Sequence, residues 1–410
     1  MRIKLLIFSS ILFLSTSCTK NNDSIPPLSE IALDKVEIIM NVTNTEQISI
    51  TTDIGNSEVN WTSNNEEIAT VDENGNIIAK NSGNCTITAR VNDVSSSCNI
   101  IVNTTLFVSG YESNTNKSKL WLNSDLIELG NGNTSGVTVK SGKSYVVGTA
   151  SDGYDKSTAK LWINDEEQNI SNFGTYASST SIFLKDNDVY ISGQIEGASY
   201  SIATYWKNNE KINITDGNHQ AWAYDLFVTN SNDIYTVGTE SNDNLVSIAT
   251  VWKNNIPQRL SSVYSGAYSI HEENNNIYVG GFEYNSSSGK TKAVVWQNGT
   301  PTYFTTGHFN AGITDVTINN GEVYCAGYSV DNSQLEQVAT LWVNGFPTYL
   351  TDGSFKASAT AVKVFNNDVY VIGRIWNGTK YNGIVWKNGI VIKTIDKFSN
   401  NIHLTGIEIK

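Results

Sequence analysis

Residues 368–388 read DVYVIGRIWNGTKYNGIVWKN and contain the pattern that decides the fold. An alternating apolar run ends at Gly373, a polar loop follows, and a second apolar run carries Trp386 and closes with Asn388-Gly389. Alternation with a period of two residues predicts β-strands, and an Asn-Gly pair predicts a tight hairpin turn. The stretch therefore predicts two strands and the turn into a third.

Copies of this pattern fill the last three quarters of the chain. A tryptophan recurs at spacings of 41, 44, 46, 44, 46 and 44 residues, as Trp121, Trp162, Trp206, Trp252, Trp296, Trp342 and Trp386. A glycine ends the apolar run before each one, namely Gly110, Gly148, Gly193, Gly238, Gly281, Gly327 and Gly373. An aromatic residue precedes each glycine by three positions, namely Phe107, Tyr145, Tyr190, Tyr235, Tyr278, Tyr324 and Tyr370. Markers that stay in step through seven copies indicate an internal repeat.

Each copy holds four short apolar runs. In the last complete copy they are residues 359–364, 369–372, 383–387 and 390–394. Four strands in a unit of about 45 residues are typical of a β-propeller blade. The order of glycine, aromatic residue and tryptophan resembles propeller repeats in general and kelch repeats loosely, although only the fifth copy has a double glycine, Gly280-Gly281. We therefore predict an all-β protein in which residues 104–410 form a seven-bladed β-propeller.

The two ends of this region predict how the ring closes. The first copy begins at Leu106 without a first strand, and residues 402–410 (IHLTGIEIK) form a last strand with no partner after it. Ile407 also lies 45 residues after Val362, in register with the first strands of the other copies. We expect the C-terminal strand to complete the first blade, because a closed ring leaves no exposed sheet edge.

The N-terminus predicts export. Arg2 and Lys4 precede an apolar core, Leu5–Leu14, which is too short to span a bilayer, since a spanning helix needs about 20 residues. Small residues then lead to Cys18, and this order resembles the lipobox of bacterial lipoproteins, although Leu14 lies four residues before the cysteine instead of three. The resemblance implies a signal peptide over residues 1–17, lipid attachment at Cys18 and a linker over residues 18–28. An ordinary secretory signal is the alternative.

Residues 29–103 carry short alternating runs at regular spacing. The central part reads VNWTSNNEEIATVDENGNIIAKNSGNCTITARV, in which Asn74-Gly75 predicts a hairpin and Trp61 and Ile68 are expected between two sheets. The order of Trp61, Ser63, Ile68, Ala69, Val71, Gly75, Gly83, Thr86, Ile87 and Ala89 resembles the bacterial group 2 immunoglobulin-like domain, BIG2. The resemblance implies an immunoglobulin-like β-sandwich that acts as an extracellular spacer or adhesion module and carries no catalysis.

Two cysteines of this domain leave two interpretations open. Cys85 is in phase with Ile87, and Cys98 is in phase with Ile100, so both thiols are expected on the apolar side of neighbouring strands. In an exported protein they could form a disulfide worth about 3 kcal/mol. The alternative is a pair of buried free thiols.

Charge and motif content narrow the classes of partner. The formal net charge of −13 argues against nucleic acid and anionic lipid, which select basic patches. His219, His271, His308 and His403 show no metal-ligand spacing, and phosphate-loop, nucleophile-elbow and calcium-loop motifs are missing from the sequence. We expect no cofactor, no metal, contact with a membrane only through the lipid anchor, and a monomer.

The copies differ most in the loops between second and third strands and between units. Both sets of loops emerge on one face of a four-stranded blade, so we place any ligand site on that face, around the mouth of the central channel. Candidate ligand-binding residues break the repeat there, namely Trp222, Tyr224, Asp225, Asp315 and Trp376. Alternatively, Trp222 and Tyr224 plug the channel, and the two aspartates are solvated or hydrogen-bonded channel residues.

Two further periodic sets are predicted to be structural. The repeated tryptophans are expected in the core of the blades. A second set precedes each first strand and is expected to wedge between blades, namely Tyr176, His219, Tyr264, Phe309, Phe355 and Phe398. Neither set is predicted to bind a cofactor.

These observations predict a lipid-anchored protein of the bacterial outer membrane or cell surface. The first hypothesis for its function is a non-enzymatic binding or adhesion module for a glycan, peptide or protein. The second is a propeller-type polysaccharide hydrolase or lyase, in which Asp225 and Asp315 are the first carboxylates to suspect. A purely structural role in an envelope complex is the third.

Overall fold

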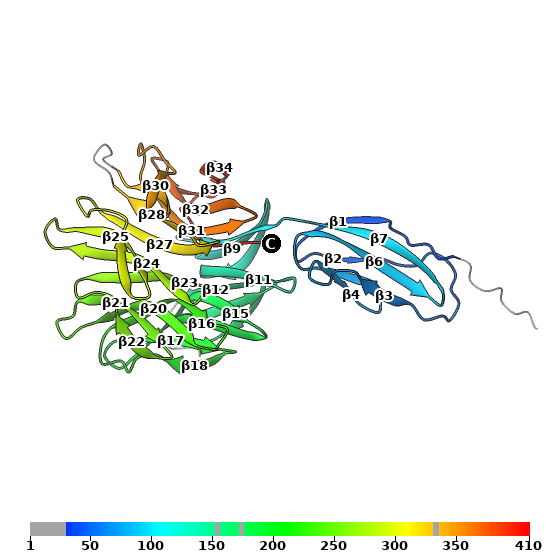
Figure 1. Cartoon of the computed structure of the whole chain (residues 1–410), viewed down its shortest axis with the longest axis horizontal. Helices are drawn as coiled ribbons and strands as arrows, with labels where there is room; N and C mark the ends of the chain where they lie inside the picture. Colours follow the sequence, from blue (N-terminus) through cyan, green and yellow to red (C-terminus); the bar gives the residue numbers. More distant parts are fainter. Residues whose placement is uncertain (1–29, 152–155, 172–175, 331–335) are drawn as a thin grey trace, which may run out of the picture.

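The computed structural model describes residues 30–151, 156–171, 176–330 and 336–410. These residues form strands β1 to β35, and no helix occurs among them. Figure 1 shows two bodies, a small one that contains β1 to β7 and a larger one that contains the later strands. The predicted signal peptide, linker and lipid-attachment residue Cys18 lie outside the described residues.

The small body is a two-sheet sandwich. One sheet has the order β1 (Glu37–Asn41), β7 (Val94–Asn103), β6 (Gly83–Val91) and β3 (Asn60–Ser63). The other has the order β2 (Thr45–Gln47), β5 (Asn76–Ala79) and β4 (Ala69–Val71). Ile48, Ile77, Ile87 and Ile100 are completely buried between them. Alternating apolar residues thus face a shared core, as expected for an immunoglobulin-like fold.

Cys85 and Cys98 are free, buried thiols. In the register of β6 and β7, Cys85 lies opposite Ile100 and Cys98 lies opposite Ile87. The two cysteines are therefore diagonal neighbours, which are typically about 7–8 Å apart and somewhat less between their Cβ atoms, whereas the Cβ atoms of a disulfide lie about 4 Å apart. The disulfide interpretation is wrong for this structure, and two buried thiols is the interpretation that it supports.

After Thr105 the described residues form seven four-stranded sheets, which we call units. In six units the strand order follows the chain, and in the first unit the last strand of the chain precedes three early ones. The first unit combines β35 (Ile402–Ile409) with β8 (Leu106–Glu112), β9 (Lys117–Leu122) and β10 (Asp125–Asn131). The others are β11 (Asn133–Lys140), β12 (Lys143–Ser151), β13 (Ser157–Ile163), β14 (Glu166–Asn169); β15 (Ala177–Lys185), β16 (Asp188–Glu196), β17 (Ser201–Lys207), β18 (Glu210–Asn213); β19 (Ala221–Val228), β20 (Ile234–Ser241), β21 (Ser247–Lys253), β22 (Ile256–Arg259); β23 (Ser265–Glu273), β24 (Asn276–Asn285), β25 (Lys290–Gln297), β26 (Thr300–Tyr303); β27 (Ala311–Asn319), β28 (Glu322–Ser329), β29 (Val338–Val343), β30 (Phe346–Tyr349); and β31 (Ala357–Phe365), β32 (Asp368–Trp376), β33 (Tyr381–Lys387), β34 (Ile390–Ile395).

The repeated glycine has a steric cause. The first strand of every unit contains a β-bulge, for example at Tyr224, which has no partner between Ala223 and Asp225. The carbonyl oxygen two residues before the bulged residue points at the glycine of the second strand. A Cβ added to any of the seven glycines would lie only 1.8–2.6 Å from that oxygen. Only glycine fits there, because any side chain would collide with backbone.

The repeated asparagine bonds the turn after the third strand of each unit to its second strand. Seven asparagines occupy the turn after the third strand, with φ between 49° and 52°. In every case the side-chain oxygen accepts a hydrogen bond of 2.8–3.0 Å from the backbone N–H at or near the start of the second strand. They are Asn123, Asn164, Asn208, Asn254, Asn298, Asn344 and Asn388. Asparagine suits this turn because it tolerates positive φ and its side chain can bond to backbone.

The predicted core role of the seven tryptophans is confirmed. Their exposed fractions range from 0 % to 4 %, and each belongs to a buried apolar cluster. Several of them pack across the space between neighbouring units. Trp386, for example, lies in the third strand of the last unit but belongs to the same cluster as Tyr324 and Leu341 of the unit before. The tryptophans therefore join the units to one another.

The C-terminal strand pairs with the first strand that follows the small body. In β35, Ile407 lies opposite Val108 of β8, antiparallel, and the same strand packs beside β11 and β31. Thr105 connects the two bodies. Its backbone N–H donates to Lys410 at 2.8 Å, and its hydroxyl accepts from Val42 at 3.0 Å. Both ends of the repeat region therefore meet where the small body is attached.

Candidate functional site

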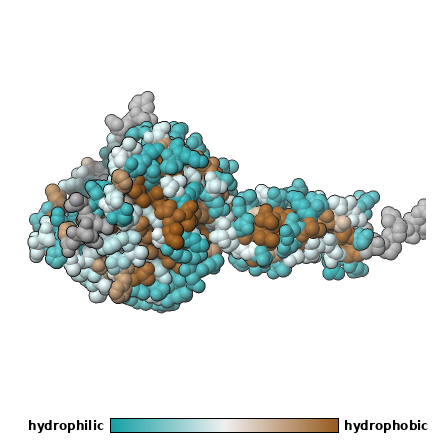
Figure 2. Space-filling view, turned by 90° about the horizontal axis from the view of Figure 1, so that it is seen from above, coloured by the Kyte–Doolittle hydropathy of each residue, from teal (hydrophilic) through white to brown (hydrophobic). Residues whose placement is uncertain are grey.

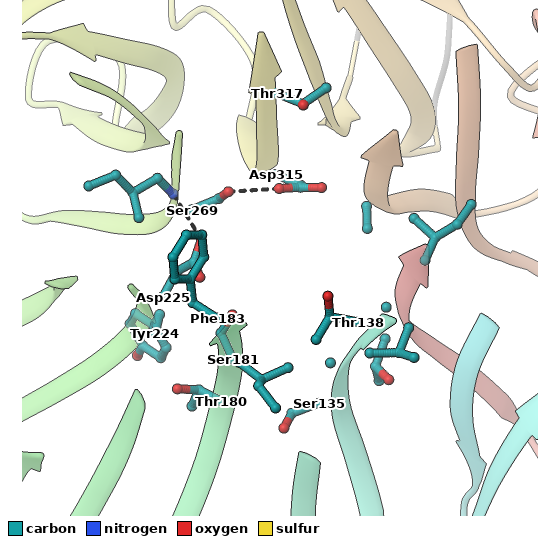
Figure 3. A pocket seen from close by; sticks show the side chains of 18 of the residues that line it. Ser135, Thr138, Thr180, Ser181, Phe183, Tyr224, Asp225, Ser269, Asp315 and Thr317 are labelled. Atoms are coloured by element: carbon teal, nitrogen blue, oxygen red, sulfur yellow. Dashed lines mark hydrogen bonds between the residues drawn. The ribbon is translucent and has the colours of Figure 1, made fainter. Parts of the chain in front are cut away.

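A central cavity of about 410 Å³ is surrounded by the first strands of all seven units. Figure 3 shows Asp225 and Asp315 together with hydroxyl side chains that converge on it. The bulged residues lie in its wall, namely Ser135, Thr180, Tyr224, Tyr268, Thr314, Thr360 and Thr405. Bulges commonly redirect a side chain at a sheet rim, and here five of the seven bulged residues carry a small hydroxyl side chain.

Several of these hydroxyl groups tie one unit to the next. Thr180 donates to the carbonyl of Ala223 at 2.7 Å, and Ser135 donates to that of Ser179 at 2.8 Å. In two units tyrosine replaces the small residue, and the rings of Tyr224 and Tyr268 pack edge to face with centroids 5.2 Å apart. Tyr224 therefore lines the cavity, whereas Trp222, the other residue of the channel-plug alternative, is not among its lining residues.

Asp225 links three consecutive first strands. One carboxylate oxygen accepts the N–H of Leu226 in its own strand at 2.8 Å. The other accepts the N–H of Ile270 in the next unit at 2.9 Å, and Ser181 of the preceding unit also bonds to the carboxylate. Burial outweighs these bonds and raises the pKa of Asp225 to about 6.

Asp315 repeats this arrangement two units later. Its carboxylate accepts the hydroxyl of Ser269 at 2.7 Å and the N–H of Val362 at 2.8 Å, so it also joins the preceding and following units. Burial raises its pKa as well. Both aspartates are thus partnered by backbone and serine groups, which matches the alternative of hydrogen-bonded channel residues.

The stability of the protein is expected to depend on the protonation of Asp225. Because its folded pKa lies above that of an exposed aspartate, the folded state binds the extra proton, and stability falls as the pH rises from about 4 to about 6. Asp225→Asn removes this term. We expect the difference in unfolding free energy between wild type and variant to change by roughly 1–2 kcal/mol across that window, in urea titrations at several pH values. A constant difference would contradict the assignment.

One end of the central cavity, which we call the lower end, faces the small body. A second cavity of about 560 Å³ lies there, and Asn81 and Ser82 of the small body line it together with Lys363 and Glu408. Lys363 lies 3.3 Å from Glu408, and this carboxylate is the main cause of the raised pKa of Lys363. The small body therefore covers the C-terminal ends of the first strands. The opposite mouth of the central cavity lies at the N-terminal ends of these strands.

A third cavity, of about 450 Å³, occupies this opposite mouth. We call it the upper pocket. It shares Thr314, Thr360 and Thr405 with the central cavity, so the two are adjacent. Its other lining residues are Tyr111, Tyr328, Gln337, Lys356, Ser358, Ala359, Arg374, His403 and Leu404. The pocket lies at the starts of β31 and β35, on the face where the variable loops emerge.

Arg374 is the centre of the upper pocket. Its Nη1 donates to Nδ1 of His403 at 2.8 Å, and its guanidinium lies 4.6 Å from the ring centre of Tyr381. His403 in turn stacks on Tyr111, with centroids 4.8 Å apart and planes 13° from parallel. Burial, followed by the Arg374 charge, lowers the pKa of His403 to about 4, so the ring is neutral at pH 7.

An adjoining pocket of about 340 Å³ is rich in aromatic residues. Phe355, Trp376 and Tyr381 line it together with Ser354 and the carboxylate residue Glu336, and it shares Lys356 with the upper pocket. Trp376 meets Tyr381 edge to face at 5.1 Å. We call it the aromatic pocket. Aromatic side chains beside a few polar groups are typical of small-molecule sites.

Four of the six residues predicted to wedge between units contradict that prediction, whereas Phe398 is half-buried and packs against Trp121 with ring centroids 6.3 Å apart. Tyr176, Tyr264, Phe309 and Phe355 expose between 37 % and 49 % of their surface. The outer strands are also exposed, with Phe346 at 78 % and Ile256 at 71 %, and Figure 2 shows hydrophobic residues on the surface of both bodies. The periodicity marked a repeated position correctly, but that position is at the surface of the variable-loop face.

The five predicted ligand-binding residues do not share one pocket. Tyr224, Asp225 and Asp315 line the central cavity, and Trp376 lines the aromatic pocket. Trp222 is half-buried in β19, opposite Thr239. The sequence analysis missed Arg374, although it directly follows the repeated Gly373 at a position where the other units have Tyr111, Thr149, Gln194, Thr239, Phe282 and Tyr328.

No group of three or more histidine, cysteine, aspartate or glutamate side chains among the described residues is arranged to hold a metal ion. Within the same residues, no helix is long and apolar enough to cross a membrane.

Comparison with known proteins supports the nature of the small body. Residues 29–102 match the family model of the bacterial Ig-like domain (group 2), which confirms the resemblance seen in the sequence. A search of curated protein sequences gave no match.

The structural similarities are weaker. TolB from Acinetobacter baumannii is 8 % identical, with a TM-score of 0.39 over 71 % of this chain and 79 % of that chain. A Hadza microbial sialidase, Hz136, is 8 % identical, with a TM-score of 0.41 over 72 % and 73 %. A Mycobacterium tuberculosis puromycin-hydrolyzing peptidase is 9 % identical, with a TM-score of 0.46 over 83 % and 54 %. These scores are too low to transfer an activity.

Proposed function

We propose that the protein is a lipid-anchored envelope protein whose repeat region is a closed seven-bladed β-propeller that binds a ligand on its variable-loop face. The propeller proposal is supported by the seven four-stranded units around one cavity and by the pairing of β35 with β8. The anchor proposal is supported by the lipobox-like residues that end at Cys18. Bacterial immunoglobulin-like modules of this group agree with an envelope location.

The observation that carries the binding function is the pair of adjoining pockets at the upper mouth. Arg374 and Lys356 supply charge there, whereas Trp376, Tyr381 and Phe355 supply aromatic surface. A few polar groups that converge beside an apolar wall are what a binding site needs for orientation and affinity. The pockets also lie away from the small body, which lines the opposite end of the cavity. An anchor that precedes the small body would therefore turn the binding face outward.

The polysaccharide hydrolase or lyase is the second candidate. Asp225 favours it in one respect, because a carboxyl with a pKa of about 6 is suited to act as a general acid. Its bonds to Leu226 and Ile270 favour a structural role instead. Product analysis separates the two candidates.

The test is a glycan and peptide array probed with the full chain in mild detergent, with product analysis of every hit. We expect binding without product, weakened about tenfold or more by Trp376→Ala. Phe346→Ala is the matched control, since this exposed aromatic residue lies on the outer strand β30. Released oligosaccharide that disappears in Asp225→Asn would replace the binding module with the enzyme. Binding that survives Trp376→Ala unchanged would contradict the proposed face.

A further inference from the structure

The upper pocket is lined by two cationic side chains, Arg374 and Lys356, and by no carboxylate. In the described parts of the chain, no ion pair joins either cation to a carboxylate. Lysines at the ends of other strands are paired, such as Lys207 with Asp188 at 2.8 Å and Lys387 with Asp368 at 2.7 Å. Unbalanced cations in a chain of net charge −13 point to an anionic ligand.

The guanidinium of Arg374 is held in a fixed orientation. One of its five N–H donors bonds to His403, and one face rests on the ring of Tyr381. Because Arg374 donates to Nδ1, the hydrogen of the neutral His403 ring is on Nε2, which makes that atom a second donor. An arginine positioned in this way suits the planar, two-oxygen geometry of a carboxylate.

The other walls of the pocket fit a polyhydroxylated ring. Hydroxyl groups of Thr314, Ser358 and Thr360 line one side, and Tyr328 adds a phenol. The aromatic pocket continues beyond Lys356 and offers Trp376 and Tyr381. The face of an aromatic ring carries partial negative charge and attracts the C–H face of a pyranose. Volumes of about 450 and 340 Å³ are within the range of small-ligand sites and leave room for one sugar in each pocket.

We infer that the upper pocket binds the carboxylate of a uronic acid within an acidic polysaccharide, with Arg374 as its main partner and the aromatic pocket holding the neighbouring sugar. This inference rests on the proposed binding function and specifies its ligand. Lys356, which is exposed at the boundary of the two pockets, adds attraction for the negative chain. Thr314, Thr360 and Thr405 line both the upper pocket and the central cavity.

The test is calorimetric titration of the full chain in mild detergent with tetramers of galacturonate, glucuronate, mannuronate and guluronate. The methyl ester of each tetramer is the matched ligand control, because it keeps the rings and removes the charge. We expect at least one uronate to bind at least tenfold more tightly than its ester. Arg374→Gln should reduce that affinity at least tenfold, and added salt should weaken binding.

Variants separate a binding role from a folding role. Lys356→Gln changes an exposed side chain, so it should fold normally and still weaken uronate binding severalfold. Arg259→Gln, on the exposed outer strand β22, is the control that should bind like wild type. Partial rescue of binding by Arg374→Lys with an unchanged melting temperature would also support direct contact with the anion.

Different results would contradict the uronate inference and the proposed binding function. Equal binding of acid and ester, or full affinity in Arg374→Gln, would overturn the uronate inference and leave a neutral-glycan module standing. Binding of peptides with a free C-terminal carboxylate through Arg374, without uronate binding, would replace the sugar with a peptide. Absence of any glycan or peptide ligand that is sensitive to Trp376→Ala would contradict the proposed function itself.

Discussion

Removal of residues 402–410 is expected to abolish the cooperative thermal unfolding of the repeat region. These residues form β35, which completes the four-stranded sheet of β8, β9 and β10. Four of its side chains, Ile402, Leu404, Ile407 and Ile409, expose at most 5 % of their surface. Burial of each one contributes about 1.5–3 kcal/mol, so their loss amounts to about 6–12 kcal/mol. A loss of that size approaches the whole stability of a typical domain, which is about 5–15 kcal/mol.

The truncation also exposes edges that the intact chain covers. Without β35, β8 presents its unpaired backbone to solvent, and β11 and β31 lose the strand that lies between them. Differential scanning calorimetry and near-ultraviolet circular dichroism of the full and truncated chains measure the effect. Lys410→Ala is the control at the same terminus, because 30 % of the Lys410 side chain is exposed and Glu408 keeps Lys363 as an ion-pair partner, so the expected cost is at most about 1 kcal/mol. If the truncated chain melted at the wild-type temperature, the closed-ring proposal would be wrong.

The sequence was sufficient to find the units because two of their markers have local causes. The tryptophan must fill a buried space in every unit, and Trp342 and Trp386 have no exposed surface. The glycine must lie against a carbonyl oxygen, as Gly373 does against Ser358. Constraints of this kind act identically in each copy, so they leave a periodic signal in one sequence.

The features that the sequence did not predict depend on contacts between units. Asp225 and Asp315 break the repeat, and that departure suggested a site, but their partners Ile270 and Val362 lie 45 and 47 residues away. The bulge that directly precedes each of these aspartates has no signature in composition. A departure from a repeat therefore marks either a ligand site or a bond between units, and only the fold distinguishes them.

The same reasoning explains Arg374 and the thiols. Arg374 follows a marker glycine, yet its importance comes from His403 and Tyr381, which two other strands supply. Cys85 and Cys98 share an apolar face, as predicted, but a shift of two residues in register separates them. Periodicity assigns a side chain to a face and leaves its partner along that face undetermined.

Trp342→Ala is expected to lower the unfolding free energy by about 3–5 kcal/mol, because the indole is completely buried and its removal leaves a cavity. Trp342→Phe should cost much less, about 1–2 kcal/mol. The phenyl ring still fills most of the space, and the indole Nε1 forms no hydrogen bond in the structure, so the change leaves no polar group without its partner.

The control in the same unit is Phe346→Ala, which should change stability by less than about 0.5 kcal/mol because 78 % of Phe346 is exposed. Urea unfolding followed by far-ultraviolet circular dichroism gives all three differences. Equal losses in Trp342→Phe and Trp342→Ala would show that the indole N–H has a hydrogen-bond partner, such as a buried water molecule. The contribution of Trp342 to stability would then come from this hydrogen bond and not from the volume of the side chain. A small loss in both variants would mean that the tryptophan is not what joins the unit of β27–β30 to its neighbour.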